Sequence, residues 1–230
     1  MKVMILAAGR GERMRPLTDF TPKPLLPIVD KTIIEHTIER LVACGFKEIV
    51  INHAYLGAQI EAHLGDGQRY GATIQYSAEG ELGLETAGGI INALPLLGEK
   101  PFMVVNGDIA TDFSFEQLIN QPKRLAHLVM VSNPEHHASG DFGLSLNGQV
   151  LTDADELCTF SGIGVYDPAL FNDIATGSFK LGALLRQAIL KGQVTGQKYA
   201  GFWMDIGTPE RLEELRLYYK KNVDSDLFSC

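Results

Sequence analysis

Four basic residues and two glycines lie in the loop that follows the first apolar run of the chain. The stretch LAAGRGERMRPLTDFTPKPLLP covers residues 6–27 and carries Arg10, Arg13, Arg15 and Lys23. Glycines let backbone N–H groups approach an anion, while arginine and lysine neutralise its charge. Because the chain as a whole has a net charge of −8, this local basic loop favours a small anionic ligand over nucleic acid. The alternative is a solvated basic turn.

The glycine spacing of this loop matches neither common phosphate-binding pattern. Gly9 and Gly11 fit the start of G-x-G-x-x-G, but Met14 stands where the third glycine belongs, and the next predicted helix begins only at Thr32. No Gly-Lys-Ser/Thr sequence follows, so the loop is not of the Walker A type either. Prolines stiffen its path instead. We therefore expect a long, ordered loop that wraps a polyphosphate.

Two aspartates end apolar runs far apart in the chain. Asp108 follows FMVVNG, and Asp205 follows GFWM. Mg²⁺ is held by one or two carboxylates together with phosphate oxygens and water, so two such residues form a metal site if the fold brings them together. The alternative is that each aspartate caps a turn or a helix.

The basic loop and two later segments together resemble the sugar-1-phosphate nucleotidyltransferase family. The family signature is L-A-A-G-x-G-x-R-x-x-P-L-T…P-K-P-L, which this chain matches at Leu6, Ala7, Ala8, Gly9, Gly11, Arg13, Pro16, Leu17, Thr18, Pro22, Lys23, Pro24 and Leu25. The segments VNGD and WMDIGTPERL match two later family motifs in order and spacing. The resemblance thus covers most of the chain.

The resemblance implies catalytic roles for four residues. Arg13 would hold the departing pyrophosphate and Lys23 the reacting phosphates, while Asp108 and Asp205 would bind one Mg²⁺. It also implies that the nucleotide lies against Ala8, Gly9, Gly11, Glu12, Arg13, Lys23 and Glu85. The nucleophile, a sugar 1-phosphate, is already an anion. The reaction therefore needs alignment and charge neutralisation rather than a general base or a covalent residue.

Within the family, the sequence is similar above all to uridylyltransferases that act on N-acetylmuramate α-1-phosphate in peptidoglycan recycling. The stretches that carry this similarity are EIVINHAYLGAQIEAHLGDG, GLETAGGI, NPEHHASGDF and TFSGIGV. It implies UMP transfer from UTP, giving UDP-N-acetylmuramate and pyrophosphate. Mannose-1-phosphate guanylyltransferases and other sugar-1-phosphate nucleotidyltransferases are the alternative; Glu85 stands where the guanylyltransferases carry the glycine of L-G-T-A-G. A catalytically silent nucleotide-sensing subunit is the alternative from another class.

The sugar site is predicted from strand ends and from the resemblance. Asn52 ends the second predicted strand, and Asn106 lies near the end of the fourth, so both amides are expected at the edge of the sheet where ligands bind. Asp141 and Glu156 resemble positions at which relatives contact the sugar. Loop acids in solvent are the alternative for both.

Strands and helices alternate over the first half of the chain, and this order must position the loops. Short apolar runs predict strands at 2–7, 47–52, 73–77 and 101–108, and helical spacing predicts helices at 32–45, 54–67 and 86–97. Such alternation is typical of an α/β fold, here a Rossmann-like, doubly wound mixed sheet of the nucleotidyltransferase (GT-A-like) kind. The basic loop would then lie at the carboxyl edge of the sheet.

After about residue 125, strands follow one another with turns rather than helices between them. The second half is expected to add an antiparallel sugar-binding cap, then a helix at 179–193, a hairpin-like return at 194–207 and a helix capped by Thr208. We expect one domain, 1–230, made of a nucleotide-binding core (1–125), a mainly sugar-binding part (126–200) and the metal-aspartate motif with a closing helix (201–220).

Composition sets the outer limits of these expectations. The chain has 230 residues, of which 45% are hydrophobic and 21% charged, so it can bury a sizeable core. No stretch reaches the roughly 18 apolar residues of a membrane span, and the first apolar run is too short for a signal peptide. We expect a cytoplasmic monomer or weak dimer that binds UTP and a sugar 1-phosphate. Two polar features are expected in solvent: the histidine pair 136–137 and the Glu/Arg face of the helix at 208–221.

Overall fold

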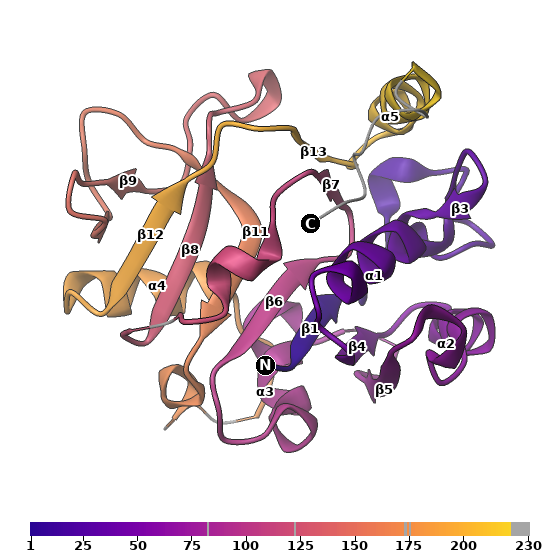
Figure 1. Ribbon diagram of the computed structural model, residues 1–230, viewed down its shortest axis with the longest axis horizontal. Coiled ribbons are helices and arrows are strands. Elements are labelled where there is room, and N and C mark those ends of the chain that lie inside the picture. Colours follow the sequence, from indigo (N-terminus) through magenta and orange to yellow (C-terminus); the bar gives the residue numbers. More distant parts are fainter. Residues whose placement is uncertain (82, 122, 173, 175, 222–230) are drawn as a thin grey trace.

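A mixed seven-stranded sheet forms the centre of the protein (Figure 1). The computed structural model describes residues 1–81, 83–121, 123–172, 174 and 176–221. The strand order is β12-β8-β11-β6-β1-β4-β5, in which neighbours are parallel except where β11 pairs with β6 and β8. These strands are β1 (Val3–Leu6), β4 (Glu48–His53), β5 (Thr73–Ala78), β6 (Phe102–Asn106), β8 (Ala126–Val131), β11 (Thr159–Tyr166) and β12 (Val194–Lys198).

Helices cover both faces of this sheet. They are α1 (Ile33–Ala43), α2 (Gly57–Leu64), α3 (Glu85–Leu97) and α4 (Leu181–Leu190), joined by α5 (Pro209–Lys221) beyond the sheet edge. Along β1, Val3 and Ile5 pack in one core with α1 and α2, whereas Met4 packs in a second core with α3 and α4. Because β1 is buried on both faces, its sequence is an unbroken apolar run rather than an alternating one.

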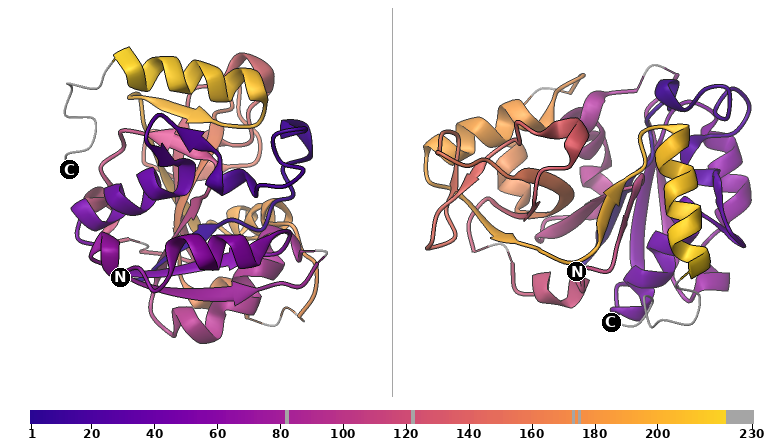
Figure 2. Two further views of the ribbon diagram at one scale, coloured as in Figure 1. Left: turned by 90° about the vertical axis from the view of Figure 1, so that its right-hand side faces the viewer. Right: turned by 90° about the horizontal axis from the view of Figure 1, so that it is seen from above.

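A third, smaller core lies beneath α5 and fixes the loop that follows β1. Its buried residues include Met14, Leu26 and Ile28 from the loop region and Leu212 and Leu215 from α5. Figure 2 shows α5, in yellow, above these indigo segments.

The short elements of the chain are the two-stranded pairs β2 (Pro27–Ile28) with β3 (Lys31–Thr32), β7 (Ile109–Thr111) with β13 (Trp203–Asp205) and β9 (Gly143–Leu144) with β10 (Val150–Leu151), and 3-10 helices at Glu12–Met14, Lys23–Leu25, Gln68–Tyr70, Phe115–Leu118, Glu135–His137 and Pro168–Phe171.

The predicted α/β fold with a mixed sheet is confirmed, and one predicted connection is wrong. The segment 194–207 is not a hairpin. Its first half, β12, lies parallel to β8 at the edge of the main sheet, and its second half, β13, pairs with β7. The helix α4 returns the chain to that edge, where Val194 and Gly196 are buried against the sheet. The strand partners therefore lie outside the segment. The predicted helix after Thr208 is confirmed, since α5 begins at Pro209.

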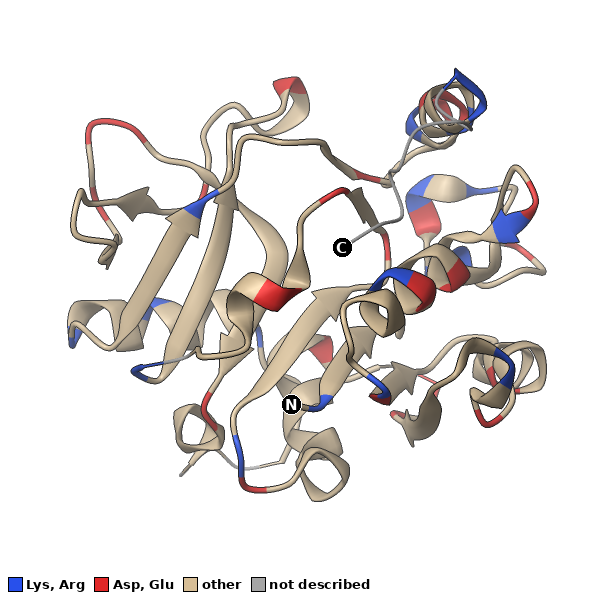
Figure 3. Ribbon diagram, in the orientation of Figure 1, with Lys and Arg blue, Asp and Glu red and all other residues tan. Residues whose placement is uncertain are grey.

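No Lys, Arg, Asp or Glu residue occupies an interior position in the strands of the seven-stranded sheet, as the colours of the ribbon show (Figure 3). In β4 and β12 such residues occupy terminal positions, Glu48 and Lys198, while α5 carries acids and bases together. None of the helices in the described part of the chain has the length and apolar character that crossing a bilayer requires.

Glu35 connects the start of α1 to the turn at Gln68–Tyr70. Its carboxylate accepts hydrogen bonds from the Thr32 backbone N–H at 2.9 Å, the Thr32 hydroxyl at 2.7 Å and the Tyr70 hydroxyl at 2.7 Å. Burial alone would raise the pKa of this carboxyl. The hydrogen bonds from Thr32, Tyr70 and His63 outweigh burial and lower the pKa of Glu35 to about 2.

We expect Glu35→Gln to lower the free energy of unfolding by about 1–3 kcal/mol at neutral pH. The folded-state pKa lies below the unfolded value, so the carboxylate contributes fully above about pH 5, and its contribution shrinks as the pH falls toward 2. Urea unfolding at about pH 7, 5 and 3 measures this, with Glu48→Gln as an exposed control. A deficit of equal size at all three pH values would contradict the assignment.

Candidate active site

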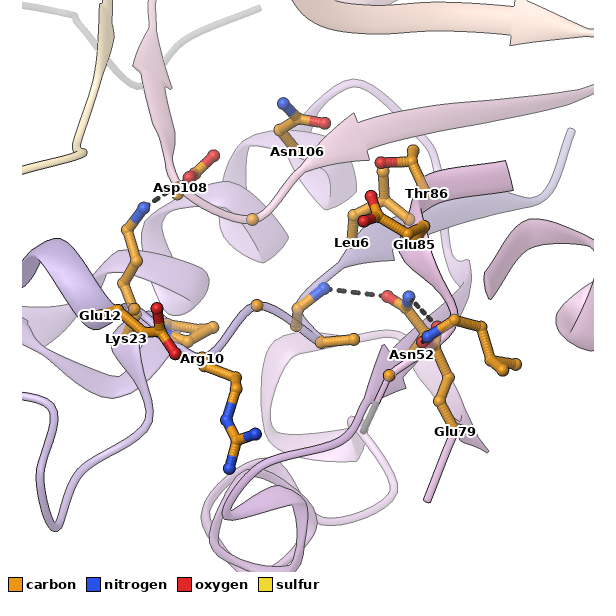
Figure 4. A pocket seen from close by; sticks show the side chains of 18 of the residues that line it. Leu6, Arg10, Glu12, Lys23, Asn52, Glu79, Glu85, Thr86, Asn106 and Asp108 are labelled. Atoms are coloured by element: carbon orange, nitrogen blue, oxygen red, sulfur yellow. Dashed lines mark hydrogen bonds and ion pairs between the residues drawn. The ribbon is translucent and has the colours of Figure 1, made fainter. Parts of the chain in front are cut away.

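A cavity of about 750 Å³ opens at the carboxyl ends of β1, β4 and β6. A doubly wound sheet binds ligands at this edge. Figure 4 shows Lys23 and Asp108 on one side of the cavity and Glu85 on the opposite side. The cavity lining brings together these residues predicted from the sequence: Ala8, Gly9, Gly11, Glu12, Arg13, Lys23, Asn52, Glu85, Asn106 and Asp108. The other predicted residues, Asp141, Glu156 and Asp205, are not among those that line it.

Gly11 orders the basic loop that follows β1. Its φ of 66° lies in the left-handed region, and its carbonyl accepts hydrogen bonds from the Met14 N–H at 2.8 Å and the Thr18 hydroxyl at 2.7 Å. A Cβ at this position would lie 2.9 Å from the Thr18 methyl carbon. Both Met14 and Thr18 are buried. The loop is therefore held from within and presents its glycine backbone and Arg13 in defined positions.

The other two arginines of the loop differ in their surroundings. Arg10 lines the cavity but points away from Lys23 and Asp108, with its guanidinium 5.4 Å from the centre of the Tyr55 ring (Figure 4). Arg15 is exposed and pairs with Asp19 at 3.4 Å. Neither adds to the charge beside Asp108.

Lys23 forms an ion pair with Asp108 at the cavity wall. Its Nζ lies 2.5 Å from Oδ2 of Asp108. The Lys23 side chain is 10% exposed, whereas that of Asp108 is 37% exposed. A nearly buried ammonium group needs a charged or polar partner, and Asp108 supplies it from the turn after β6.

Asp205 reaches the same region from a neighbouring strand. The strands β13 and β7 are antiparallel, and the Ile206 N–H donates to the Asp108 carbonyl at 2.7 Å. The Oδ1 atom of Asp205 lies 2.5 Å from Nη1 of Arg211 and 2.9 Å from Nε2 of His136. The sequence predicted that His136 and Arg211 face solvent. The structure instead places both against Asp205, the second predicted metal ligand.

The two aspartates fit a hard divalent cation. Asp108 lies in the turn between β6 and β7, and Asp205 ends β13, which pairs with β7. Each carboxylate forms its ion pairs through one oxygen, Oδ2 in Asp108 and Oδ1 in Asp205. Carboxylate oxygens completed by phosphate oxygens are the donor set that Mg²⁺ prefers. A cation bound here would compete with Lys23 and Arg211 for those oxygens.

Asn52 links the ends of three strands. Its Oδ1 accepts the Ala7 N–H at 2.9 Å, and its Nδ2 donates to Oε1 of Glu79 at 2.5 Å, while Oε2 of Glu79 accepts the Leu84 N–H at 2.7 Å (Figure 4). Asn52 is only 2% exposed. Both polar atoms of its amide are thus bonded to the chain itself, which gives Asn52 a positioning role at the cavity wall. The sugar contact predicted for it stays a prediction.

Glu85 begins α3 in a left-handed backbone conformation. Its φ is 59°, a value that is unfavourable for a residue with a side chain by about 1–3 kcal/mol. The N–H groups of Ala87 and Gly88 donate to the carbonyl of Phe179 at 2.9 and 3.3 Å, which fixes the first turn of the helix. No hydrogen bond or ion pair with another described residue engages the exposed Glu85 carboxylate. Glu85 thus brings to the cavity a carboxylate that no other described residue engages.

Asn106 packs against a bulge in β11. The register with β8 shifts between Phe160 and Gly164, and Gly162 has a φ of 79°. A Cβ on Gly162 would lie 2.5 Å from Cγ of Asn106, so only glycine fits there. The Trp203 indole N–H donates to the Ser161 carbonyl at 2.9 Å and supports this bulge.

Asp141 and Glu156 are not among the residues that line the cavity. The Asp141 carboxylate accepts the Phe160 N–H at 2.8 Å and lies 3.1 Å from Nε2 of His137, which ties the preceding turn to the start of β11. Glu156 is exposed. The structure does not bring these two residues together with the phosphate loop.

Sequence reasoning missed several cavity and cavity-rim residues. Glu79 follows directly on β5, and a strand-end rule applied to every strand would have found it. Arg211 belongs to the same WMDIGTPERL motif as Asp205, but its Glu/Arg neighbours made it look like part of a solvated helix face. Thr86 and Ser178 also line the cavity. No local sequence pattern marks Ser178 as a cavity residue.

The sheet order and the site define an α/β protein with a glycine-containing basic loop and Asp108 at the carboxyl edge of the sheet, beside which Asp205 lies on the strand that pairs with β7. Residues 2–222 match the family described as nucleotidyl transferase. The chain belongs to this nucleotidyl transferase family.

Two relatives and one solved structure show how close this likeness is. The chain is 52% identical to an N-acetylmuramate alpha-1-phosphate uridylyltransferase of Neisseria meningitidis serogroup B, over 93% of this chain and 96% of that protein. A protein of the same name from Caulobacter vibrioides is 35% identical, over 90% and 92%. The crystal structure of a putative glucose-1-phosphate thymidylyltransferase from Bacillus anthracis superposes with a TM-score of 0.82 at 23% identity, over 95% and 94%, which shows the shared fold.

We expect Asn52→Ala to lower the free energy of unfolding by about 2–4 kcal/mol, because it leaves the Ala7 N–H and the Glu79 carboxylate without their partner. Denaturant unfolding measures this loss. The matched control is Asn92→Ala, whose amide bonds Ser77 and Ala78 outside the cavity. Equal losses in the two variants would contradict a special role for Asn52.

Proposed function

We propose that the protein transfers UMP from UTP to N-acetylmuramate α-1-phosphate, giving UDP-N-acetylmuramate and pyrophosphate. The observation that carries this proposal is the meeting of Lys23 and Asp108 beside the glycine-containing loop at the carboxyl edge of the sheet. Family membership supports nucleotidyl transfer as the reaction type. The name of the 52% identical relative supports the choice of base and sugar.

In this proposal the residues of the chain align two anions and reduce their repulsion. Backbone groups from Ala8 to Gly11 and the Arg13 guanidinium hold the two phosphates that leave as pyrophosphate. Lys23 lies beside the phosphorus that is attacked. A phosphate oxygen of the sugar phosphate forms a bond to the α-phosphorus while the bond to the leaving pyrophosphate breaks in line. Because the nucleophile is already charged, no side chain has to accept a proton.

Asp108 and Asp205 are the proposed Mg²⁺ ligands. Bound Mg²⁺ would supply charge stabilisation at the phosphate oxygens. Opposite the phosphate loop, Glu85 and Asn106 are proposed to contact the base or the sugar, since both line the cavity. We further propose that the reaction takes place in the cytoplasm, with the protein acting as a monomer or weak dimer.

A pyrophosphate-release assay tests the substrate assignment. It crosses UTP, GTP, dTTP and CTP with the 1-phosphates of N-acetylmuramate, N-acetylglucosamine, glucose and mannose. We expect kcat/KM to be highest for UTP with N-acetylmuramate α-1-phosphate. A higher value for GTP with mannose 1-phosphate would replace this proposal with the guanylyltransferase alternative, and no turnover with any pair would favour a nucleotide-sensing subunit.

We expect Asp108→Asn to lower kcat by about 100-fold or more while the protein stays folded, because the amide neither binds the metal nor neutralises Lys23 as a carboxylate does. Steady-state kinetics combined with thermal unfolding measures both effects. Asp153→Asn, in an exposed turn, serves as the control. Near-normal turnover of the Asp108 variant would remove this residue from the proposed metal site.

A further inference from the structure

The guanidinium of Arg211 lies at the rim of the cavity rather than on the solvated face of α5. Its side chain is 15% exposed, and its Nη1 lies 2.5 Å from Oδ1 of Asp205 and 2.7 Å from Nε2 of His136. Arg211 is in the first turn of α5, directly after the loop that carries Gly207. This short connection holds the guanidinium next to the cavity wall.

A second guanidinium meets Arg211 over Gly207. This glycine lines the cavity, and a Cβ on it would collide with Nη2 of Arg211 and lie 3.3 Å from Nη2 of Arg13. Arg13 has no hydrogen bond or ion pair with another described residue. Asp205 therefore balances only one of two neighbouring positive charges. Two guanidinium groups at this spacing repel each other unless an anion lies against both, and phosphate oxygens suit their fork geometry.

We propose that Arg211 is a second phosphate-binding arginine of this site and that, together with Arg13, it binds the two phosphates that leave as pyrophosphate. Asp205 is the partner that orients Arg211 at the cavity rim. Gly207 leaves room for both guanidinium groups, because a Cβ there would displace the end of the Arg211 side chain. The proposal rests on the proposed nucleotidyl transfer, but it depends neither on the base nor on the sugar.

Competition at Asp205 links metal binding to phosphate binding. A divalent cation at Asp205 would share the one negative charge that balances Arg211 at 2.5 Å, so it would weaken the attraction of this carboxylate for the guanidinium. Arg211 would then be available to the phosphates that bind together with the cation. By linkage, pyrophosphate bound to Arg211 also increases the affinity of Asp205 for the metal.

Two titrations of the folded protein test this inference, using the parent, Arg211→Gln and Arg211→Lys. The matched control is Arg216→Gln, on the same helix, where the arginine bonds the Pro27 carbonyl and Glu213 away from the cavity. Paramagnetic resonance follows Mn²⁺ binding without nucleotide, and calorimetry follows pyrophosphate binding at saturating Mg²⁺. In Arg211→Gln, Mn²⁺ should bind about fivefold more tightly, because a competing charge is gone. Pyrophosphate should bind on the order of 10- to 100-fold more weakly, with Arg211→Lys between this variant and the parent.

The two measurements separate this role from a structural one. Pyrophosphate affinity of Arg211→Gln within twofold of the parent would overturn the proposal. Weaker Mn²⁺ binding together with a lower melting temperature would also overturn it, because Arg211 would then only support Asp205; Arg211→Lys keeps the test valid if the glutamine variant unfolds. A parent protein that binds no pyrophosphate would overturn nucleotidyl transfer itself, whereas a different preferred base or sugar leaves these titrations unchanged.

Discussion

The amide of Asn52 is the interaction on which the shape of the cavity depends. Parallel strands end at one edge of the sheet, and the backbone groups just beyond their ends need new partners. Asn52 gives Ala7 an acceptor and Glu79 a donor, and Glu79 in turn accepts the Leu84 N–H. A Cβ on Gly89 of α3 would collide with Glu79 and lie 2.8 Å from Nδ2 of Asn52, so the helix can approach only with glycine there. One buried side chain thereby fixes the distance between the phosphate loop and the start of α3.

On the side of the cavity that carries Asp108, ion pairs rather than amide hydrogen bonds hold the side chains in place. Each of the two aspartates is paired with a basic residue from another element, Lys23 with Asp108 and Arg211 with Asp205. A carboxylate paired in this way stays oriented, and the basic partner stays next to the place where phosphate charge would collect in the proposed reaction. In the proposed function, an acidic chain would bind phosphates without a large basic patch, because its carboxylates hold the cations at one place.

The sequence was most informative where the relevant residues are adjacent in the chain or follow a strand. Gly11, Lys23 and Asp108 were predicted because a loop after a buried apolar run must reach the carboxyl edge, and the structure places them at one cavity. The hairpin at 194–207 was predicted wrongly because β12 and β13 find their partners in β8 and β7, and strand pairing over such distances leaves no local pattern. The roles of Asn52 and Arg211 were missed for the same reason. Each depends on side chains brought close only by the fold.

Glu85 shows how a local conflict between sequence and backbone can mark a functional position. The resemblance places a glycine of related enzymes here, and the left-handed φ of 59° explains why glycine suits the backbone. This chain keeps the backbone conformation but adds a side chain, and its carboxylate makes no hydrogen bond or ion pair within the described structure that would offset the strain. Packing does not explain the substitution either, because Glu85 is exposed at the cavity. In the proposed function, a carboxylate held at such a position, across the cavity from the basic loop, would accept hydrogen bonds from a ligand. The hydroxyl, amide or ring N–H groups of a sugar or base are suitable donors, whereas phosphates are not.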